Sequence, residues 1–232
     1  MYDLWCLRIT CFWMSFFVIV IGMSAQRPER RLRFNPYLQS SAPVLLISTG
    51  SLRSATAFHK MDLKLRQSVI SLAAQPTHAD DYLQHVPLAG LLLLNGLNFA
   101  KPVHSIQRQI LLGGSSLLLT EIAAQSVKVL TKIERPDYSN KHSFPSGHTA
   151  WAFAGAELVW QEFGYRQKWI GIAAYSVAGM TGLLRIYNNR HWTTDVLAGA
   201  GIGMLSVKLN YFIEHYISQK KSKNEIHSSN II

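Results

Sequence analysis

Three polar clusters interrupt an otherwise apolar stretch of this chain: KVLTKIERP at residues 128–136, PSGH at 145–148 and RIYNNRHWTTD at 185–195. Their residues include two arginines and a lysine that can bind phosphate, two histidines, a carboxylate at Asp195 and a Ser-Gly turn with free backbone N–H groups. A site needs these groups to hold a phosphoryl group and to attack it. The candidate site residues are Lys128, Arg135, Ser146, Gly147, His148, Arg185, His191 and Asp195.

The apolar segments around these clusters predict an all-α, membrane-associated bundle of about five or six helices. Most of their apolar cores are shorter than the roughly 20 residues that a membrane span needs. They are therefore expected to be short or tilted spans, or else buried helices of a soluble bundle. Small residues at 198–203 predict a tight helix–helix contact in the last segment. The five segments are Val86–Ala100, Ser105–Ile133, Thr149–Phe163, Trp169–Leu184 and Thr193–Ile217.

Connectivity brings the clusters together at one end of this bundle. His148 stands at the start of helix 149–163, and the short turn 164–168 makes the next helix run back antiparallel. Arg185 therefore lies level with His148. The helix that ends at residue 133 carries Lys128 to the same end, where His191 opens the last helix. We expect one site formed by all three clusters.

Composition and charge narrow the function classes. Apolar residues make up 48% of the 232 residues and charged residues only 16%, which favours a membrane protein or a very apolar bundle. The net charge of +10 fits anionic lipid or a phosphorylated substrate, and no nucleic-acid motif accompanies it. Basic residues at the opposite helix ends predict a cytoplasmic location for those ends and a periplasmic active site. These basic residues are Lys101, Arg108, Arg166 and Lys168.

The two ends of the sequence differ from its middle. Residues 1–25 resemble either a cleaved secretory signal or an uncleaved anchor helix, because arginines directly after residue 25 disfavour export. Residues 26–85 are predicted to be a polar, irregular segment with one amphipathic helix at Leu63–Ala73. Residues 86–217 are the predicted catalytic domain, and residues 218–232 a frayed basic tail. Both cysteines, Cys6 and Cys11, lie in the N-terminal segment.

Each candidate residue suits one step of phosphoryl transfer. His191 and Asp195 are four residues apart, so on a helix the carboxylate can fix the imidazole tautomer and leave the other nitrogen free to attack phosphorus. His148 is placed to protonate the leaving oxygen. Arg135 and Arg185 are donors suited to two phosphate oxygens each, and no metal is needed. The remaining phosphate donors are Lys128, Ser146 and Gly147.

The spacing Lys-x6-Arg-Pro, Pro-Ser-Gly-His and Arg-x5-His-x3-Asp resembles that of the type 2 phosphatidic acid phosphatase (PAP2) superfamily. This superfamily also includes soluble class A acid phosphatases and vanadium haloperoxidases. The resemblance covers residues 128–195 and implies an all-α bundle, a phosphohistidine on His191, a general acid at His148 and no metal or other cofactor. Leu184 stands where the family usually has a serine that donates to phosphate.

The sequence therefore predicts a phosphatase for an envelope lipid in a bacterial inner membrane. Lipid A phosphate and undecaprenyl diphosphate rank first, then phosphatidylglycerol phosphate and phosphatidic acid. Three alternatives stay open: a soluble periplasmic acid phosphatase, a vanadate-dependent haloperoxidase and a catalytically silent phospholipid-binding protein. His142 is a further candidate for substrate contact, Arg190 and Lys132 are interpreted as local charge, and no role is assigned to His59, His78, His85 and His104.

Overall fold

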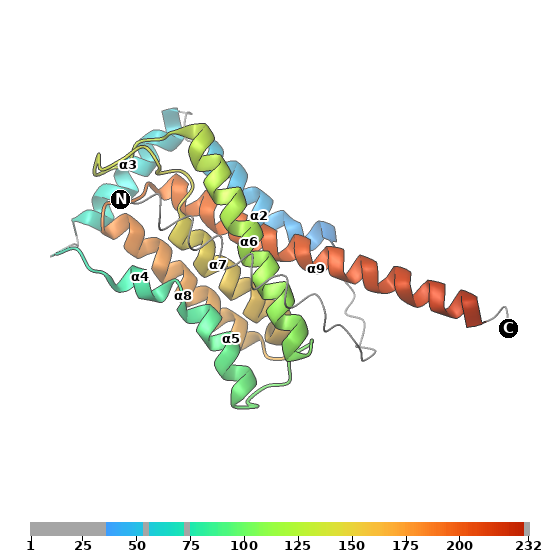
Figure 1. Ribbon diagram of the computed structural model, residues 1–232. Helices are drawn as coiled ribbons and strands as arrows, with labels where there is room; N and C mark the ends of the chain where they lie inside the picture. Colours follow the sequence, from blue (N-terminus) through green and yellow to red (C-terminus); the bar gives the residue numbers. More distant parts are fainter. Residues whose placement is uncertain (1–35, 53–55, 72–74, 230–232) are drawn as a thin grey trace, which may run out of the picture.

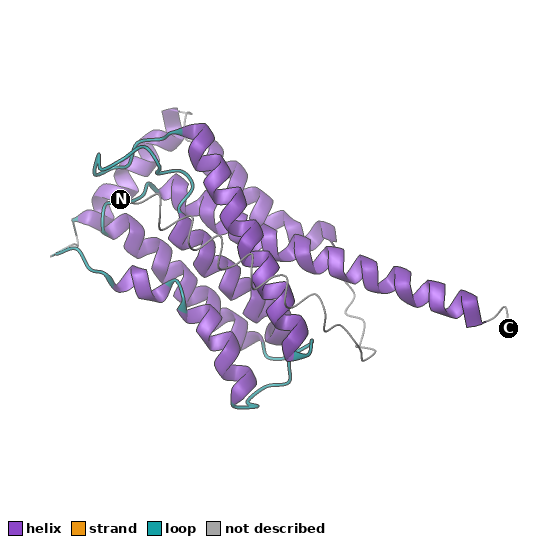
Figure 2. Cartoon of the chain, viewed as in Figure 1, coloured by secondary structure: helices purple, strands orange, loops and turns teal. Residues whose placement is uncertain are grey.

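The computed structural model describes residues 36–52, 56–71 and 75–229. Within these ranges the chain is all-helical, without a strand, which confirms the predicted fold class (Figure 2). The described residues form eight α-helices and one π-helical turn. They are α2 (Pro36–Ser51), α3 (Thr56–Ile70), α4 (Ala79–Leu83), α5 (Val86–Gly96), α6 (Ile106–Thr131), α7 (Gly147–Val159), the π-helix η2 (Trp160–Gly164), α8 (Lys168–Tyr187) and α9 (Thr193–Ser229).

Two expectations about the ends of the chain were wrong. The segment 26–85 is not mainly irregular, because α2, α3 and α4 occupy most of its described part, and the amphipathic helix begins at Thr56 rather than Leu63. The basic tail does not fray at residue 218, because α9 continues to Ser229. The signal or anchor at residues 1–25 lies outside the described residues.

Three of the described helices are long and apolar enough to cross a membrane. They are the whole of α6, the whole of α8, and residues Thr193–Lys220 of α9. The helix α5 is apolar but shorter than a span. The described part of the chain is thus a helical bundle with three candidate membrane spans.

Small residues let α9 pass close to two neighbours. A Cβ atom on Gly203 would lie 2.2 Å from the Ala150 carbonyl oxygen, and one on Gly199 would lie 2.4 Å from the Ser146 carbonyl oxygen, both in or beside α7. A Cβ atom on Gly201 would lie 2.6 Å from the Pro43 carbonyl oxygen of α2. The predicted tight contact is confirmed, and α9 lies between α7 and α2 (Figure 1).

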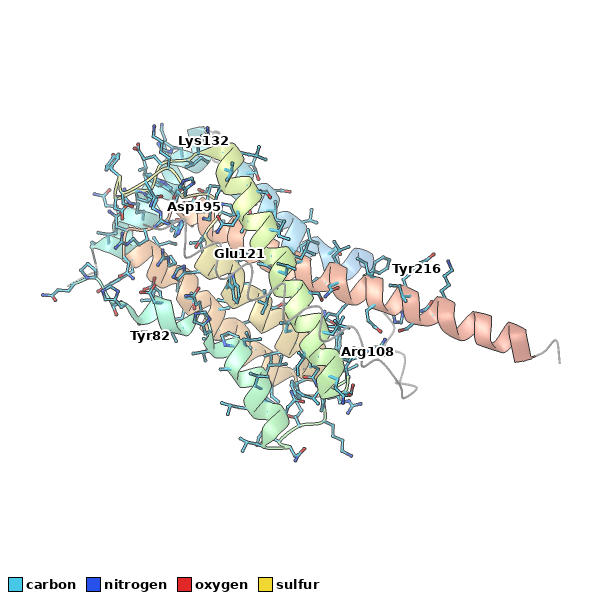
Figure 3. All side chains as sticks on the ribbon, in the orientation of Figure 1. Tyr82, Arg108, Glu121, Lys132, Asp195 and Tyr216 are labelled. Atoms are coloured by element: carbon cyan, nitrogen blue, oxygen red, sulfur yellow. The ribbon has the colours of Figure 1, made fainter. Side chains whose placement is uncertain are left out.

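The direction of the helices decides where polar side chains collect. The α7–η2 unit runs away from Ser146, three residues turn the chain, and α8 runs back. The start of α7, the end of α8, the end of α6 and the start of α9 therefore share one end of the bundle, which we call the site end. Asp195 and Lys132 mark this end in Figure 3, and Arg108 lies at the opposite, far end.

Candidate active site

Lys128 links the first cluster to the second. The helix α6 ends at Thr131, and Lys132 takes a left-handed conformation with φ 47° that turns the chain back over the helix end. Lys128, 7% exposed, then donates from Nζ to the carbonyl oxygen of Pro145 and, at 3.2 Å, to that of His142. The ammonium group is thereby held at the site end in a buried position.

The second cluster is tied to the third through the backbone. Ser146 is the N-cap residue of α7, and its backbone N–H donates to the Asp195 carbonyl oxygen at 2.9 Å. Its hydroxyl lies 2.9 Å from that of Thr149. Gly147 and His148 occupy the first turn of α7, where backbone N–H groups have no acceptor within the helix and favour an anion.

The third cluster places His191 differently from the prediction. The helix α9 begins at Thr193, so His191 precedes it and does not share a helical face with Asp195. The pair still meets, with 3.4 Å between His191 Nδ1 and Asp195 Oδ2. The same carboxylate accepts hydrogen bonds from the Ser143 hydroxyl and, at 2.9 Å, from the Trp192 backbone N–H. Asp195 is thus fixed, and its distance from His191 is longer than that of a good hydrogen bond.

Three buried nitrogen atoms at this end lack a hydrogen-bond partner among the described residues. They are Nε of Arg135, Nε of Arg185 and Nδ1 of His191. A buried donor without a partner costs about 1–3 kcal/mol of folding free energy. Arg185 is 6% exposed and His191 1% exposed, so water reaches neither side chain freely. An anion with several oxygen atoms would satisfy the two arginine nitrogen atoms, whereas His191 Nδ1 faces Asp195.

The surroundings of the two histidines lower both pKa values. Burial, followed by the charges of Arg185, Lys128 and Arg135, holds the pKa of His191 well below its ordinary value. This imidazole is therefore neutral at neutral pH, as a nucleophile must be. Burial and then Arg185 lower the pKa of His148, against the opposing influence of Asp81. Burial and then Arg185 also lower the pKa of Arg135.

Two acids of α4 also reach the site end, and the sequence analysis missed them as site residues. Asp80 is 2% exposed, and its carboxylate lies 2.5 Å from Nη1 of Arg185. Asp81 Oδ1 lies 3.0 Å from Nε2 of His148. The only available signal was a pair of adjacent acids just ahead of the first apolar helix.

The helix α3 braces the third cluster through two side chains that the sequence analysis also missed. Buried Asp62 accepts hydrogen bonds from the Thr193 backbone N–H at 2.7 Å and from the Thr194 hydroxyl at 3.0 Å. Arg66 donates from Nε to Asn189 Oδ1 at 2.8 Å, and its guanidinium lies 5.0 Å from the ring centre of Trp192. These contacts hold the loop that carries His191.

Asp80, Asp81 and His148 are also the one group among the described residues whose ligand atoms are close enough to share a metal ion, within 4.8 Å of one another. The geometry fits a cation poorly. Asp80 is already paired with the Arg185 guanidinium, which would repel a metal ion, and Asp81 is paired with His148 itself. These two carboxylates are better described as acids that border the proposed anion site and pair with its Arg185 and His148.

Other candidates have plainer roles. His142 is exposed, and its backbone carbonyl rather than its ring contacts the site through Lys128. Arg190 pairs with Asp137 at 3.0 Å near the site loop. Leu184, which replaces the usual serine, is half-buried. His104 does have a partner, since its Nδ1 lies 2.8 Å from the buried Glu162 at the far end.

Comparison with known proteins finds a similarity to one family over part of the chain. Residues 109–218 match the sequence model of the PAP2 superfamily. A lipid A 1-phosphatase from Porphyromonas gingivalis is 38% identical over 141 residues, which are 61% of this chain and 32% of that protein. The chain thus spans about a third of the length of this relative.

One solved structure supports the fold. A transmembrane PAP2-type phosphatidylglycerolphosphate phosphatase from Bacillus subtilis is similar with a TM-score of 0.51 and 22% identity, over 76% of this chain and 97% of that one. LpxE from Aquifex aeolicus has a TM-score of 0.48 and 22% identity, over 64% and 93%. All eight candidate site residues lie inside region 109–218, which is the part of the chain that is similar to the PAP2 superfamily.

Proposed function

We propose that this protein is a metal-independent phosphatase that hydrolyses a phosphorylated envelope lipid through a phosphohistidine on His191. One observation carries the proposal. A neutral, buried histidine lies among two arginines and a lysine, and the buried Nε atom of each arginine has no partner among the described residues. Such an arrangement costs folding free energy unless an anion binds, so it favours a phosphate site.

The reaction follows from the position of each group. The phosphate oxygens accept from Arg135, Arg185, Lys128 and the first N–H groups of α7, which stabilise the charge of the transition state. The free nitrogen of His191 attacks phosphorus while Asp195 holds the imidazolium that forms. The bond from phosphorus to the leaving oxygen breaks, and His148 gives that oxygen a proton. Water then attacks the phosphohistidine and releases inorganic phosphate.

A lipid substrate fits the body of the protein. The site end is formed by the ends of helices that include the three candidate membrane spans. The relative from Porphyromonas gingivalis is a lipid A 1-phosphatase. Lipid A phosphate and undecaprenyl diphosphate remain the first substrates to test, followed by phosphatidylglycerol phosphate and phosphatidic acid. Basic residues at the far end favour an inner-membrane protein whose site faces the periplasm.

Phosphate release by detergent-purified protein tests the proposal. The panel holds these four lipids and p-nitrophenyl phosphate, with EDTA throughout, and compares the wild type with His191→Ala and with His142→Ala. His142 is a matched control because its ring is exposed, and its only hydrogen bond with a described candidate site residue is through the backbone carbonyl, which the substitution keeps. We expect phosphate release from at least one lipid. This activity should persist in EDTA and in His142→Ala, and it should be lost in His191→Ala.

Other outcomes point to different proteins. Rapid turnover of p-nitrophenyl phosphate without release from any lipid would indicate a broad acid phosphatase. Halide oxidation that requires added vanadate would indicate a haloperoxidase. Lipid binding without release would indicate a silent binding protein, and loss of activity in EDTA would contradict the metal-free mechanism.

A further inference from the structure

The helix α4 is fastened to the end of α8 beside the phosphate-binding groups (Figure 1). Asn188 forms a clip, since its side-chain amide donates to the Thr77 carbonyl oxygen at 2.7 Å and accepts from the Thr77 backbone N–H at 2.9 Å. The same amide donates to Asp80 Oδ1 at 2.8 Å. Because Asp80 also pairs with Arg185, the position of α4 relative to the site is fixed.

Asp81, the next residue, faces the general acid. Its Oδ1 lies 3.0 Å from Nε2 of His148 and 3.9 Å from Nη1 of Arg185. Unlike Asp80, its side chain is 49% exposed, so it stands at the mouth of the site. A leaving oxygen that takes its proton from His148 would therefore contact the same imidazole ring as this carboxylate.

The acids of α4 also change the charge of the site. Lys128, Arg135, Arg185 and the protonated His148 carry four positive charges, of which Asp195, Asp80 and Asp81 balance three. Burial alone would raise the pKa of Asp81, but hydrogen bonds with His148 and His78 lower it, so this carboxylate is ionised at neutral pH. A site with only one net positive charge is poorly suited to a substrate with several phosphates.

We propose that Asp81 is a specificity-determining residue, which favours phosphomonoesters with an uncharged alcohol leaving group over diphosphates whose leaving group is itself a phosphate. The inference rests on the proposed function and on the role of His148 as general acid. In a monoester, the bond to phosphorus breaks, the proton moves from His148 to the leaving oxygen, and a neutral alcohol departs past Asp81. In a diphosphate, an anionic phosphate monoester must form and depart beside the same carboxylate.

Farnesyl monophosphate and farnesyl diphosphate separate these cases, because they share one lipid and differ only in the leaving group. The measurement is kcat/KM for phosphate release from each in detergent, for the wild type, Asp81→Asn, Asp81→Glu and Asp137→Asn. Each variant is assayed at the pH of its own maximum, so that a change in the protonation of His148 does not alter the ratio. Asp137 is the matched control, a carboxylate near the site that pairs with Arg190.

We expect Asp81→Asn to raise the ratio of diphosphate to monophosphate kcat/KM about five- to tenfold, a size typical of one partly screened charge near the reacting group. Asp81→Glu and Asp137→Asn should leave the ratio near the wild-type value. A structural role would lower both activities together and leave the ratio unchanged.

Three results would overturn the inference. The first is an unchanged ratio in Asp81→Asn, and the second is an equal rise of the ratio in Asp81→Glu. The third is the loss of activity on both substrates in Asp81→Asn, because a variant at a specificity-determining residue should still turn over one of them. If the wild type releases phosphate from neither these two probes nor the lipid panel, the proposed function itself fails. The two failures are therefore distinguishable.

Discussion

Each end of the bundle holds a carboxylate–histidine pair, and the two pairs differ in how completely they are satisfied. At the far end, Glu162 lies 2.8 Å from His104 Nδ1 and also accepts from the Tyr211 hydroxyl at 2.6 Å and from the His104 backbone N–H at 2.9 Å. At the site end, His191 Nδ1 lies 3.4 Å from Asp195 and makes no hydrogen bond with any described residue.

The contrast extends to the neighbouring charges. At the far end, buried Glu157 accepts from Lys208 at 2.8 Å, from Gln161 at 2.6 Å and from the Tyr175 hydroxyl, so cations and acids are matched. At the site end, Arg135 and Arg185 each keep a buried nitrogen atom without a partner among the described residues. A buried network that is fully paired holds helices together, whereas one that is incomplete keeps donors ready for a ligand.

Removing the charge from each carboxylate should therefore have opposite effects. Asp195→Asn should lower kcat/KM by about 10³-fold or more, because the amide cannot stabilise the His191 imidazolium or hold its tautomer. Glu162→Gln should leave kcat/KM within about twofold and lower the unfolding temperature instead. Phosphate release and thermal unfolding in the same detergent measure both effects. Equal losses of activity in the two variants would remove the distinction between the ends.

A substitution at the far end should destabilise the fold without changing the catalytic groups. Lys208→Met leaves the Glu157 carboxylate buried without its cation, and we expect a loss of about 3–5 kcal/mol in the free energy of unfolding with little change in kcat. The double variant Glu157→Gln/Lys208→Met removes both charges and should recover most of that loss. A single variant that unfolds at the wild-type temperature would show that this pair does not stabilise the bundle.

At the site end, a substitution should raise the stability of the fold and lower the activity. Burial and the charge of Arg185 oppose the charged form of Arg135, whose Nε also lacks a partner among the described residues. Arg135→Gln should thus raise the free energy of unfolding by about 1 kcal/mol without phosphate and lower kcat/KM by about 100-fold. Arg190→Gln, a control on an exposed side chain, should change neither by much. Destabilisation by Arg135→Gln would show that this guanidinium supports the fold.

The sequence alone was sufficient to predict the position of those site residues that lie at the ends of long helices. Lys128, His148 and Arg185 could be placed together because apolar periodicity and short turns fix which helix ends coincide. His191 was placed correctly at that end, although it precedes α9 by two residues.

The missed parts depend on contacts across long sequence separations. The helix α4 has five residues, too few for a periodic pattern, and the contact from Asp80 to Arg185 joins residues 105 positions apart. The helix α2 was hidden by Pro43, which usually indicates a break, yet this helix packs on α9 where Gly201 leaves room for it. The far end was missed because Glu157 and His104 lie in unremarkable sequence and meet their partners only in the folded bundle.

The smallest predicted effect is a shift in the pH dependence of kcat/KM. His148 must be protonated to act as the acid, so kcat/KM falls as the pH rises through its pKa. Burial and then Arg185 lower that pKa, while the hydrogen bond and the charge of Asp81 raise it. Asp81→Asn removes the raising influence, so the alkaline limb of the pH profile for farnesyl monophosphate should move to lower pH. Asp137→Asn should leave the limb in place, and a move to higher pH in Asp81→Asn would contradict the role of His148 as the acid that Asp81 keeps protonated.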